Sequence, residues 1–325
     1  MENRNFKEVY NELYSKSDYM NKLKKAKDSI MMKKMIVDVS IAVCGIIIYI
    51  NKVYNFESIV SLKNCIFWIA IFVLVLINIQ LSNKKIFSRV DYTEAYKKEI
   101  IKPLIEETNL GLRYEPLGTD IEKEYLQGDY DNYDIFFSED CVYGNGYKMA
   151  DIKTVAEVLD DKGNIEKRII FNGLFSSYKI NKFFSNPIQI VIDGGFDNIQ
   201  PTRFKDKDEA HFYPTTHIKN KVQMDSITFE KHFDVYGIEK LEVMKLLTAD
   251  VMEELVKIKE KNKFDIDLKI TKSNLLIRIH SGNIFETSDY KEALDIYELK
   301  NAYDLVKTVI KLAECLSKAI DETEF

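Results

Sequence analysis

The chain has 325 residues, with 46% hydrophobic and 30% charged side chains and a formal net charge of −6. This composition is ordinary for a folded protein, and the length allows one large domain or two modest ones. The four cysteines show no CxxC spacing. Without it, neither a disulfide framework nor a structural zinc site is indicated, and the cysteine usage fits a reducing compartment.

Residues 1–34 form a basic segment, within which 5–33 predict an amphipathic helix. The apolar side chains on one side of this helix are Phe6, Val9, Tyr10, Leu13 and Tyr14. Three roles are open to it: it lies at a membrane interface, it continues into the next apolar stretch, or it is a solvated helix that contributes positive charge.

Two apolar stretches follow, Met35–Ile50, which extends as far as Tyr54, and Cys65–Leu81. Each supplies about 17–20 residues, or about 26–30 Å of helix, which matches the ~30 Å hydrocarbon core of a bilayer. Because the connection between them is short, we predict a transmembrane helical hairpin over residues 35–81. Two buried core helices are the alternative.

Asp38 is the one acidic residue in these stretches. A carboxylate at mid-membrane would cost about 2.5–3.5 kcal/mol, but Asp38 lies near the beginning of the first stretch, beside Lys33 and Lys34. We therefore expect it to reach headgroups or water, with a functional intramembrane role as the alternative.

Lysine and arginine predict the orientation. Residues 1–34 carry nine basic and five acidic side chains and residues 82–99 carry five and three, whereas the loop 51–64 carries two and one. Since basic flanks stay in the cytoplasm, we predict a bacterial inner-membrane protein whose N-terminus and C-terminal domain are both cytoplasmic. Residues 100–325 carry about −12. This charge argues against nucleic acid as a partner and for a domain that stands away from anionic lipid.

Residues 82–110 are predicted to be a juxtamembrane segment. Its helix, over 91–109, starts with a capping-box pattern at Asp91 and Glu94 and should bend or break at Pro103.

Residues 111–325 predict a cytoplasmic α+β domain of mainly antiparallel strands with flanking helices. The expected strands are 135–137, 147–159, 165–180, the QIVID run after Pro187, 223–229, 232–236, 264–270 and 275–280. Glycine-rich turns at 144–146 and 161–164 separate the first of them. Residues 197–221 are polar and predict a long loop.

Two helices complete this domain. One spans 240–262, with Thr248 as a cap or kink, and a long C-terminal helix starts at Asp289 and ends near residue 320. Apolar side chains form a stripe along the C-terminal helix, which is typical of a packing face, with self-association as the alternative. It consists of Leu305, Val309, Leu312, Leu316 and Ile320.

We assign no catalytic residue, no metal ligand and no cofactor, and we expect that the chain is not an enzyme. The histidines are His211, His217, His232 and His280, and no pair has the spacing of a zinc site. His211 and His217 are expected in a surface loop, and His232 on a solvent-facing strand position.

An acidic run fails the spacing of a calcium loop, because Tyr133 occupies a ligand position, and it is expected to be a solvated loop. Its members are Asp120, Glu122, Glu124, Asp129, Asp131, Asp134, Glu139 and Asp140. The SxxK match at 176–179 has no partner motif, and Gly144–Gly146 lacks the third glycine of a dinucleotide fingerprint.

Several short runs have a recognisable order. They are GLRYEP at 111–116, Glu139-Asp140 ahead of Gly144, FNGLF at 171–175, FEKHFDVY at 229–236 and LTADVMEEL at 247–255. Together with the predicted hairpin, the chain over roughly 35–285 resembles an uncharacterised bacterial membrane family, domain of unknown function three-one-three-seven. The resemblance implies this architecture and no activity. FEKHFDVY alternates as a half-buried strand should, so these runs are interpreted as core elements.

Two functional hypotheses follow. The first is a membrane-anchored, non-enzymatic scaffold that binds a protein partner or a second copy of itself. The second is a sensor-effector whose cytoplasmic domain binds a small ligand such as a nucleotide, with Arg168, Lys179, Lys182 and Arg203 as a local basic pocket. A membrane-bound enzyme is the remaining alternative.

Overall fold

The computed structural model describes residues 5–15, 17–55, 62–83, 89–107, 111–117, 120–130, 132–159, 163–192, 220–261, 264–286 and 296–322. At 51–55, 62–67, 83 and 89–91 it describes the backbone alone. The chain divides into two compact units. The sheet unit comprises Met1–Val9, Lys97–Glu286 and Ile296–Phe325, and the hairpin unit comprises Tyr10–Tyr96 and Thr287–Asp295.

The N-terminal region contains two helices, α1 (Phe6–Tyr14) and α2 (Asp18–Asn55), so the prediction of one helix over 5–33 is wrong. The hydroxyl of Ser17 accepts a hydrogen bond from the Met20 amide at 3.3 Å, which caps a new helix at this point. From there α2 continues from the basic segment into the first apolar stretch. Of the three roles predicted for the basic helix, continuation is therefore the one observed.

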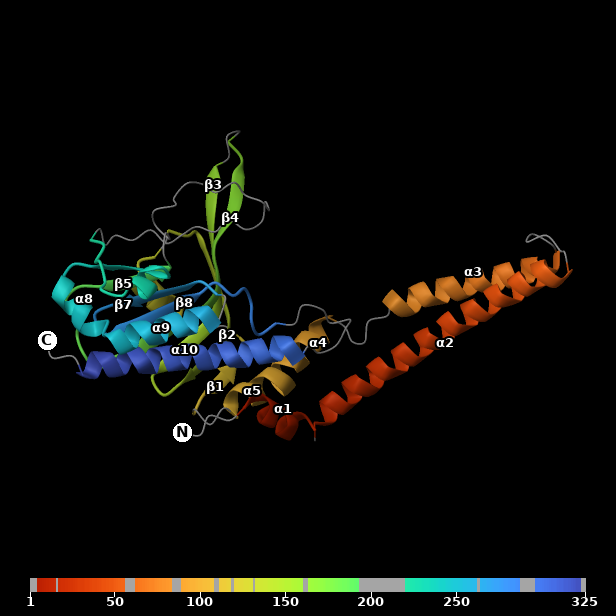
Figure 1. Cartoon of the computed structure of the whole chain (residues 1–325), viewed down its shortest axis with the longest axis horizontal. Helices are drawn as coiled ribbons and strands as arrows, with labels where there is room; N and C mark the ends of the chain where they lie inside the picture. Colours follow the sequence, from red (N-terminus) through yellow and green to blue (C-terminus); the bar gives the residue numbers. More distant parts are fainter. Residues whose placement is uncertain are drawn as a thin grey trace. The chain divides into compact units, whose positions relative to one another are not determined.

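Helix α3 (Leu62–Asn83) returns alongside α2, and the two pack together as a helical hairpin (Figure 1). Val37 and Ile48 are buried in this unit. Within the part of the chain that the structure describes, no helix is both long and apolar enough to qualify as a membrane span.

Among its described residues the sheet unit has eight strands, and every neighbouring pair is antiparallel. The strands are β1 (Arg113–Glu115), β2 (Ile135–Gly144), β3 (Tyr147–Leu159), β4 (Ile165–Lys179), β5 (Ile188–Ile192), β6 (Phe233–Gly237), β7 (Ile266–Ile270) and β8 (Asn274–Ile279). Their spatial order is β1-β2-β3-β4-β8-β7-β5-β6. The predicted α+β class and antiparallel sheet are confirmed.

One face of the sheet is aliphatic and is covered by helices. Leu268 of β7 and Ile277 of β8 are paired on this face, and both are buried. The hydroxyl of Tyr147, on β3, donates to the Ile310 carbonyl of helix α10 (Ile296–Glu322). All five residues of the predicted C-terminal stripe are buried, which confirms that it is a packing face. Helices α8 (Lys240–Leu246) and α9 (Ala249–Lys261) contact α10.

The other face of the sheet carries an aromatic core. The short helix α6 (Glu122–Gln127) and the turn after it place Tyr125 and Tyr130 against Phe171 and Phe175 of β4. The Tyr125 and Phe175 ring centroids are 5.2 Å apart in an edge-to-face arrangement, a geometry that adds to the stabilisation from burial.

Several predicted elements need correction. The strand expected at 223–229 is instead the helical turn α7 (Ile227–Glu230), because the Ser226 hydroxyl caps the Phe229 amide at 3.3 Å. The helix expected at 240–262 is two helices that break between Leu246 and Ala249, where Thr248 was predicted to interrupt it. Strand β6 is buried at all five positions rather than half-buried, since both faces of the sheet are covered there.

The juxtamembrane helix is also divided. It consists of α4 (Arg89–Tyr96), a π-helical turn η1 (Lys97–Ile101) and α5 (Lys102–Glu106), and Pro103 lies in the first turn of α5, where it is tolerated. The predicted beginning of the C-terminal helix at Asp289 and the loop over 197–219 lie outside the described residues.

Candidate functional site

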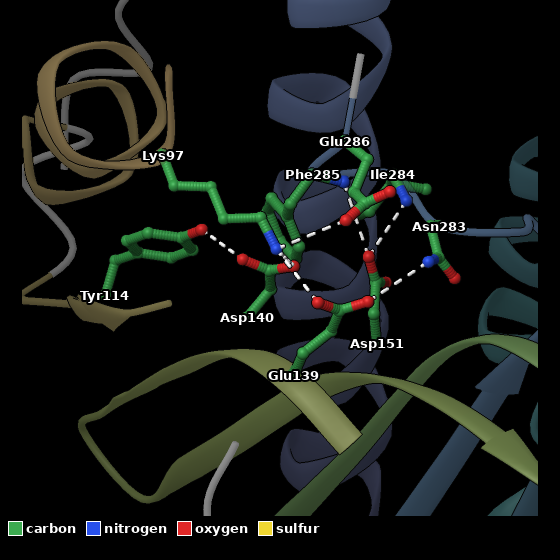
Figure 2. A network of polar contacts seen from close by, with 9 residues as sticks. All are labelled: Lys97, Tyr114, Glu139, Asp140, Asp151, Asn283, Ile284, Phe285 and Glu286. Carbon is green, nitrogen blue, oxygen red and sulfur yellow. Dashed lines mark hydrogen bonds and ion pairs between the residues drawn. The ribbon is translucent and has the colours of Figure 1, made fainter. Parts of the chain in front are cut away.

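A bulge in β2 brings two consecutive carboxylates to the same group. The pairing of β2 with β3 shifts between Glu139 and Val142, and Asp140 has a left-handed backbone conformation with φ of +57°. In a regular strand the two side chains would point to opposite faces. At the bulge both reach the ammonium group of Lys97, as Figure 2 shows.

Lys97 is the cation at the centre of this group. It belongs to the π-helical turn η1, and its side chain is only 7% exposed. Its Nζ lies 2.6 Å from Asp140 Oδ2, 3.0 Å from Glu139 Oε2 and 3.6 Å from Glu286 Oε1. The hydroxyl of Tyr114, on β1, donates to the other oxygen of Asp140.

Asp151 of β3 completes the site from the neighbouring strand. It is 2% exposed, and its Oδ2 accepts hydrogen bonds from the backbone amides of Ile284 at 2.9 Å and Phe285 at 3.3 Å. Its Oδ1 is buried and has no hydrogen-bond partner among the described residues. Asn283 of the same segment donates to Glu139 Oε1 at 3.2 Å. We call this group the carboxylate junction: Lys97, Tyr114, Glu139, Asp140, Asp151 and Glu286.

Burial changes the proton affinity of these groups. Desolvation raises the pKa of Asp140 to about 6, although Lys97 and Tyr114 oppose the rise. Desolvation, and then the nearby Asp140, raises the pKa of Asp151 well above its usual range. Burial disfavours the charge on Lys97, but the Asp140 and Glu139 carboxylates outweigh it and raise the pKa of the lysine.

The chemistry open to this arrangement is proton binding. Its carboxylates converge on an ammonium group and on backbone amides. Among the residues that the structure describes, no group of three or more His, Cys, Asp or Glu side chains is arranged to hold a metal ion. The junction joins η1, β1, β2, β3 and the segment after β8, so protonation there acts on the contacts between these elements.

The prediction that the acidic run is a solvated loop is wrong for part of the run. Glu139 and Asp140 lie on β2, Asp140 is fully buried, and Glu122 and Glu124 lie on α6. The local sequence is polar, but Lys97 and Tyr114 supply the partners that make burial of Asp140 tolerable. Asp131 lies outside the described residues.

Asp151 was missed as a site residue altogether. The available signal was the position of Asp151 in the predicted strand 147–159, where it alternates with Tyr147 and Met149 and should face the core. A charged residue on a buried strand position requires a partner, and those partners are the amides that follow β8.

A second buried polar group lies on the aromatic face of the sheet. Arg278 of β8 is 1% exposed, and its Nη2 is 2.6 Å from Asp267 Oδ2 on β7. Its guanidinium carbon stacks 3.8 Å from the centre of the Tyr130 ring. Gln189 of β5 donates to Asp267 Oδ1 at 3.3 Å. These contacts are internal, so this group joins neighbouring strands.

The basic pocket proposed for a nucleotide is not brought together among its described members. Arg168 and Lys179 lie at opposite ends of β4, about 36 Å apart at ~3.3 Å per residue. Arg168 pairs with Glu166 at 3.1 Å, and Lys182 donates to the Asp321 carbonyl at 2.9 Å. Arg203 lies outside the described residues.

One of the histidines differs from prediction. His232 lies in the turn before β6, not on a strand, and is 3.6 Å from Glu260. His280 packs edge-on against Phe171, and His211 and His217 lie outside the described residues.

The comparisons with known proteins bear on this fold. Residues 169–318 match the model of a family described as "Protein of unknown function (DUF3137)". The family resemblance predicted from the sequence is thus confirmed, and the match covers 169–318 rather than the predicted 35–285. The match does not include the hairpin or the β2 bulge. No curated protein matches the chain.

A solved structure similar to this chain is the mycobacterial trehalose monomycolate transport factor A, TtfA. The sequence identity is 10% and the TM-score is 0.35. The similarity covers 70% of this chain and 97% of that one. At this level it carries no argument about function.

Proposed function

We propose that this protein is a membrane-anchored, non-enzymatic interaction module of the bacterial inner membrane. In this proposal the α2–α3 hairpin is the anchor, and the sheet unit, with the N-terminus, is cytoplasmic and binds a protein partner or a second copy of the chain. Lipid is the first partner of the molecule, and nucleic acid is not one.

The surface of the hairpin is the observation that carries the proposal. Large apolar side chains are exposed along both helices: Met31, Met32, Met35, Ile36, Val39, Val43, Ile46, Tyr49 and Ile50 on α2, and Trp68, Ile69, Phe72, Val73, Val75, Leu76, Ile77 and Ile79 on α3. Soluble monomers rarely expose an apolar surface of this extent, because each such side chain would gain about 1.5–3 kcal/mol on burial. Lipid chains would cover it on all sides.

A polar contact inside the hairpin is consistent with a lipid environment. The Asn78 side-chain amide of α3 donates to the Asp38 carboxylate of α2, and the Ser82 hydroxyl lies 3.4 Å from Asn78 Oδ1. Polar side chains at membrane depth turn toward partners on neighbouring helices, where a hydrogen bond contributes about 0.6–2 kcal/mol. The contact would lower the cost of Asp38 near the lipid boundary.

The non-enzymatic part of the proposal rests on the carboxylate junction. Its carboxylates are held by Lys97, Tyr114 and backbone amides, and none is within hydrogen-bond distance of a serine, cysteine or histidine side chain in the contacts described above. The nucleotide-binding form of the sensor alternative relied on a local basic pocket, two of whose members, Arg168 and Lys179, lie far apart on β4. We therefore propose no second function.

Flotation with liposomes tests the anchor. The full-length chain should float with vesicles and resist extraction at high pH, whereas a variant with Ile69→Asp, Phe72→Asp and Leu76→Asp should stay in the dense fraction. Leu159→Asp with Ile165→Asp is the matched control, because both side chains are exposed apolar residues of the sheet unit. A full-length chain that remains monodisperse and unattached to vesicles without detergent would contradict the proposal.

A further inference from the structure

Two of the four points at which the chain passes between the two units lie in the carboxylate junction. The sheet unit resumes at Lys97, after the hairpin helices, and its central segment ends at Glu286. These two residues pair directly, with 3.6 Å between Lys97 Nζ and Glu286 Oε1. A change in the junction therefore acts on both ends of the segment 97–286 together.

We propose that the carboxylate junction is a proton-operated latch, which holds the η1 turn and the 281–286 segment on β2 and β3 when it is protonated and releases them when it loses its protons. This inference goes beyond membrane anchoring and does not depend on the environment of the hairpin.

The balance of charge in the junction supports a latch. The described contacts place these titratable groups around Asp140 and its partner Lys97: Tyr114 from β1, Glu139 from β2, Asp151 from β3 and Glu286 from the segment after β8. One ammonium group thus faces several carboxylates. Carboxylates that gather around one ammonium group in a buried site repel one another, and a bound proton relieves that repulsion.

The burial of Asp151 supports it independently. One of its oxygens accepts two amide hydrogen bonds, but the other is buried without a partner. An ionised carboxylate in such a place is costly, so the closed junction favours the neutral acid. When the 281–286 segment leaves, water can reach Asp151 and the ionised form is no longer disfavoured.

The direction of the pH effect follows from the proton affinities. In the closed junction the pKa of Asp140 is about 6, against its ordinary value of 3.8 in an open, solvated one. The closed state thus binds the proton more tightly, and closing is favoured as the pH falls. Between about pH 7 and about pH 5 this single group shifts the equilibrium about tenfold toward the closed state. Asp151 acts in the same direction.

Amide hydrogen exchange on the full-length protein in detergent tests the latch. Peptides covering 97–106 and 279–286 should be about tenfold more protected near pH 5 than near pH 7, after correction for the intrinsic pH dependence of exchange. Peptides from α9, which lies outside the junction, are the internal reference. Protection that changes no more than this reference would overturn the proposal.

Two variants assign the effect to the junction. Asp140→Asn keeps the shape, tolerates the left-handed backbone and cannot titrate, so it should be protected near pH 7 almost as well as the unmodified chain is near pH 5. Lys97→Met removes the cation and should make the pH dependence steeper. Glu166→Gln, in an exposed pair with Arg168, is the matched control and should leave the profile unchanged.

If Asp140→Asn retains the full pH dependence of the unmodified chain, the latch is refuted. If that variant does not fold, the profile of the unmodified chain and that of Asp151→Asn decide the matter. Asp151→Asn should lose the part of the pH dependence of protection that comes from Asp151. An unchanged profile would count against the proposal.

Discussion

Arg278 illustrates how single side chains hold the sheet together. Its guanidinium contacts Asp267 on the neighbouring strand, the Tyr125 hydroxyl at 3.2 Å and the face of Tyr130. A buried ion pair contributes little net stability compared with apolar residues, but removal of one partner leaves an uncompensated buried charge. Substitution of Arg278 would therefore leave the carboxylate of Asp267, which is 4% exposed, buried without its counter-ion.

We predict that Arg278→Met lowers the free energy of unfolding by about 3–5 kcal/mol. Lys257→Met is the control, because Lys257 forms an exposed pair with Glu253 and its loss should change stability by less than about 0.5 kcal/mol. Urea denaturation monitored by circular dichroism measures the free energy of unfolding of both variants. If the two substitutions lowered the free energy of unfolding equally, the prediction for the buried Arg278–Asp267 pair would be wrong.

At the scale of elements, the backbone of β4 passes very close to the residues at the end of β8. Gly173 lies where a Cβ would come within 2.0 Å of the Ile279 carbonyl oxygen and 2.8 Å of the Ser281 amide. Both are backbone atoms and cannot rotate away. The Leu174 amide also bonds to the Ser281 hydroxyl at 3.3 Å, so the segment that carries Asn283 and Glu286 starts from this contact.

Gly173→Ala should therefore separate β4 from the residues after β8 and lower stability by about 1–3 kcal/mol. It should also weaken the protection of peptide 279–286 from hydrogen exchange, since that peptide begins at the displaced atoms. Gly45→Ala is the control: nothing lies within 4 Å of a Cβ there, and alanine favours a helix by about 0.5–1 kcal/mol. Unchanged stability in Gly173→Ala would mean that the strands adjust without cost.

At the scale of the whole molecule, charge and apolar surface are distributed in opposite ways. The hairpin exposes apolar side chains along α2 and α3 and has basic flanks in the sequence, whereas residues 100–325 carry about −12. The proposed topology uses both properties: lipid covers the apolar helices, and the basic flanks remain on the cytoplasmic side.

This topology predicts which sites are accessible from outside the cell. In a cysteine-free background, Ser58→Cys in the short connection should react with a membrane-impermeant maleimide on intact spheroplasts. Lys257→Cys, at an exposed position of α9, should react only after the membrane is permeabilised. Labelling of the second site in intact spheroplasts would reverse the orientation, and labelling of neither site would contradict the external loop.

Much of the local structure could be predicted because it depends on neighbours along the chain. The glycine turn at 144–146 separates β2 from β3 because its residues adopt positive φ, which glycine favours. The apolar stripe from Leu305 to Ile320 lies on one side of α10 because it repeats with the helical period. Where a cap overrides the pattern, as at Ser17 and Ser226, the predicted element was wrong.

The sequence by itself therefore determined the α+β class, the antiparallel strands, the two apolar helices and the C-terminal packing helix. Only the tertiary structure decided the carboxylate junction, because Lys97 and Asp140 are 43 residues apart and Asp151 and Phe285 are 134 apart. No local period links such residues. They meet because the order of the strands and the bulge in β2 bring them together, and burial then raises the pKa of Asp140 to about 6 and that of Asp151 well above its usual range.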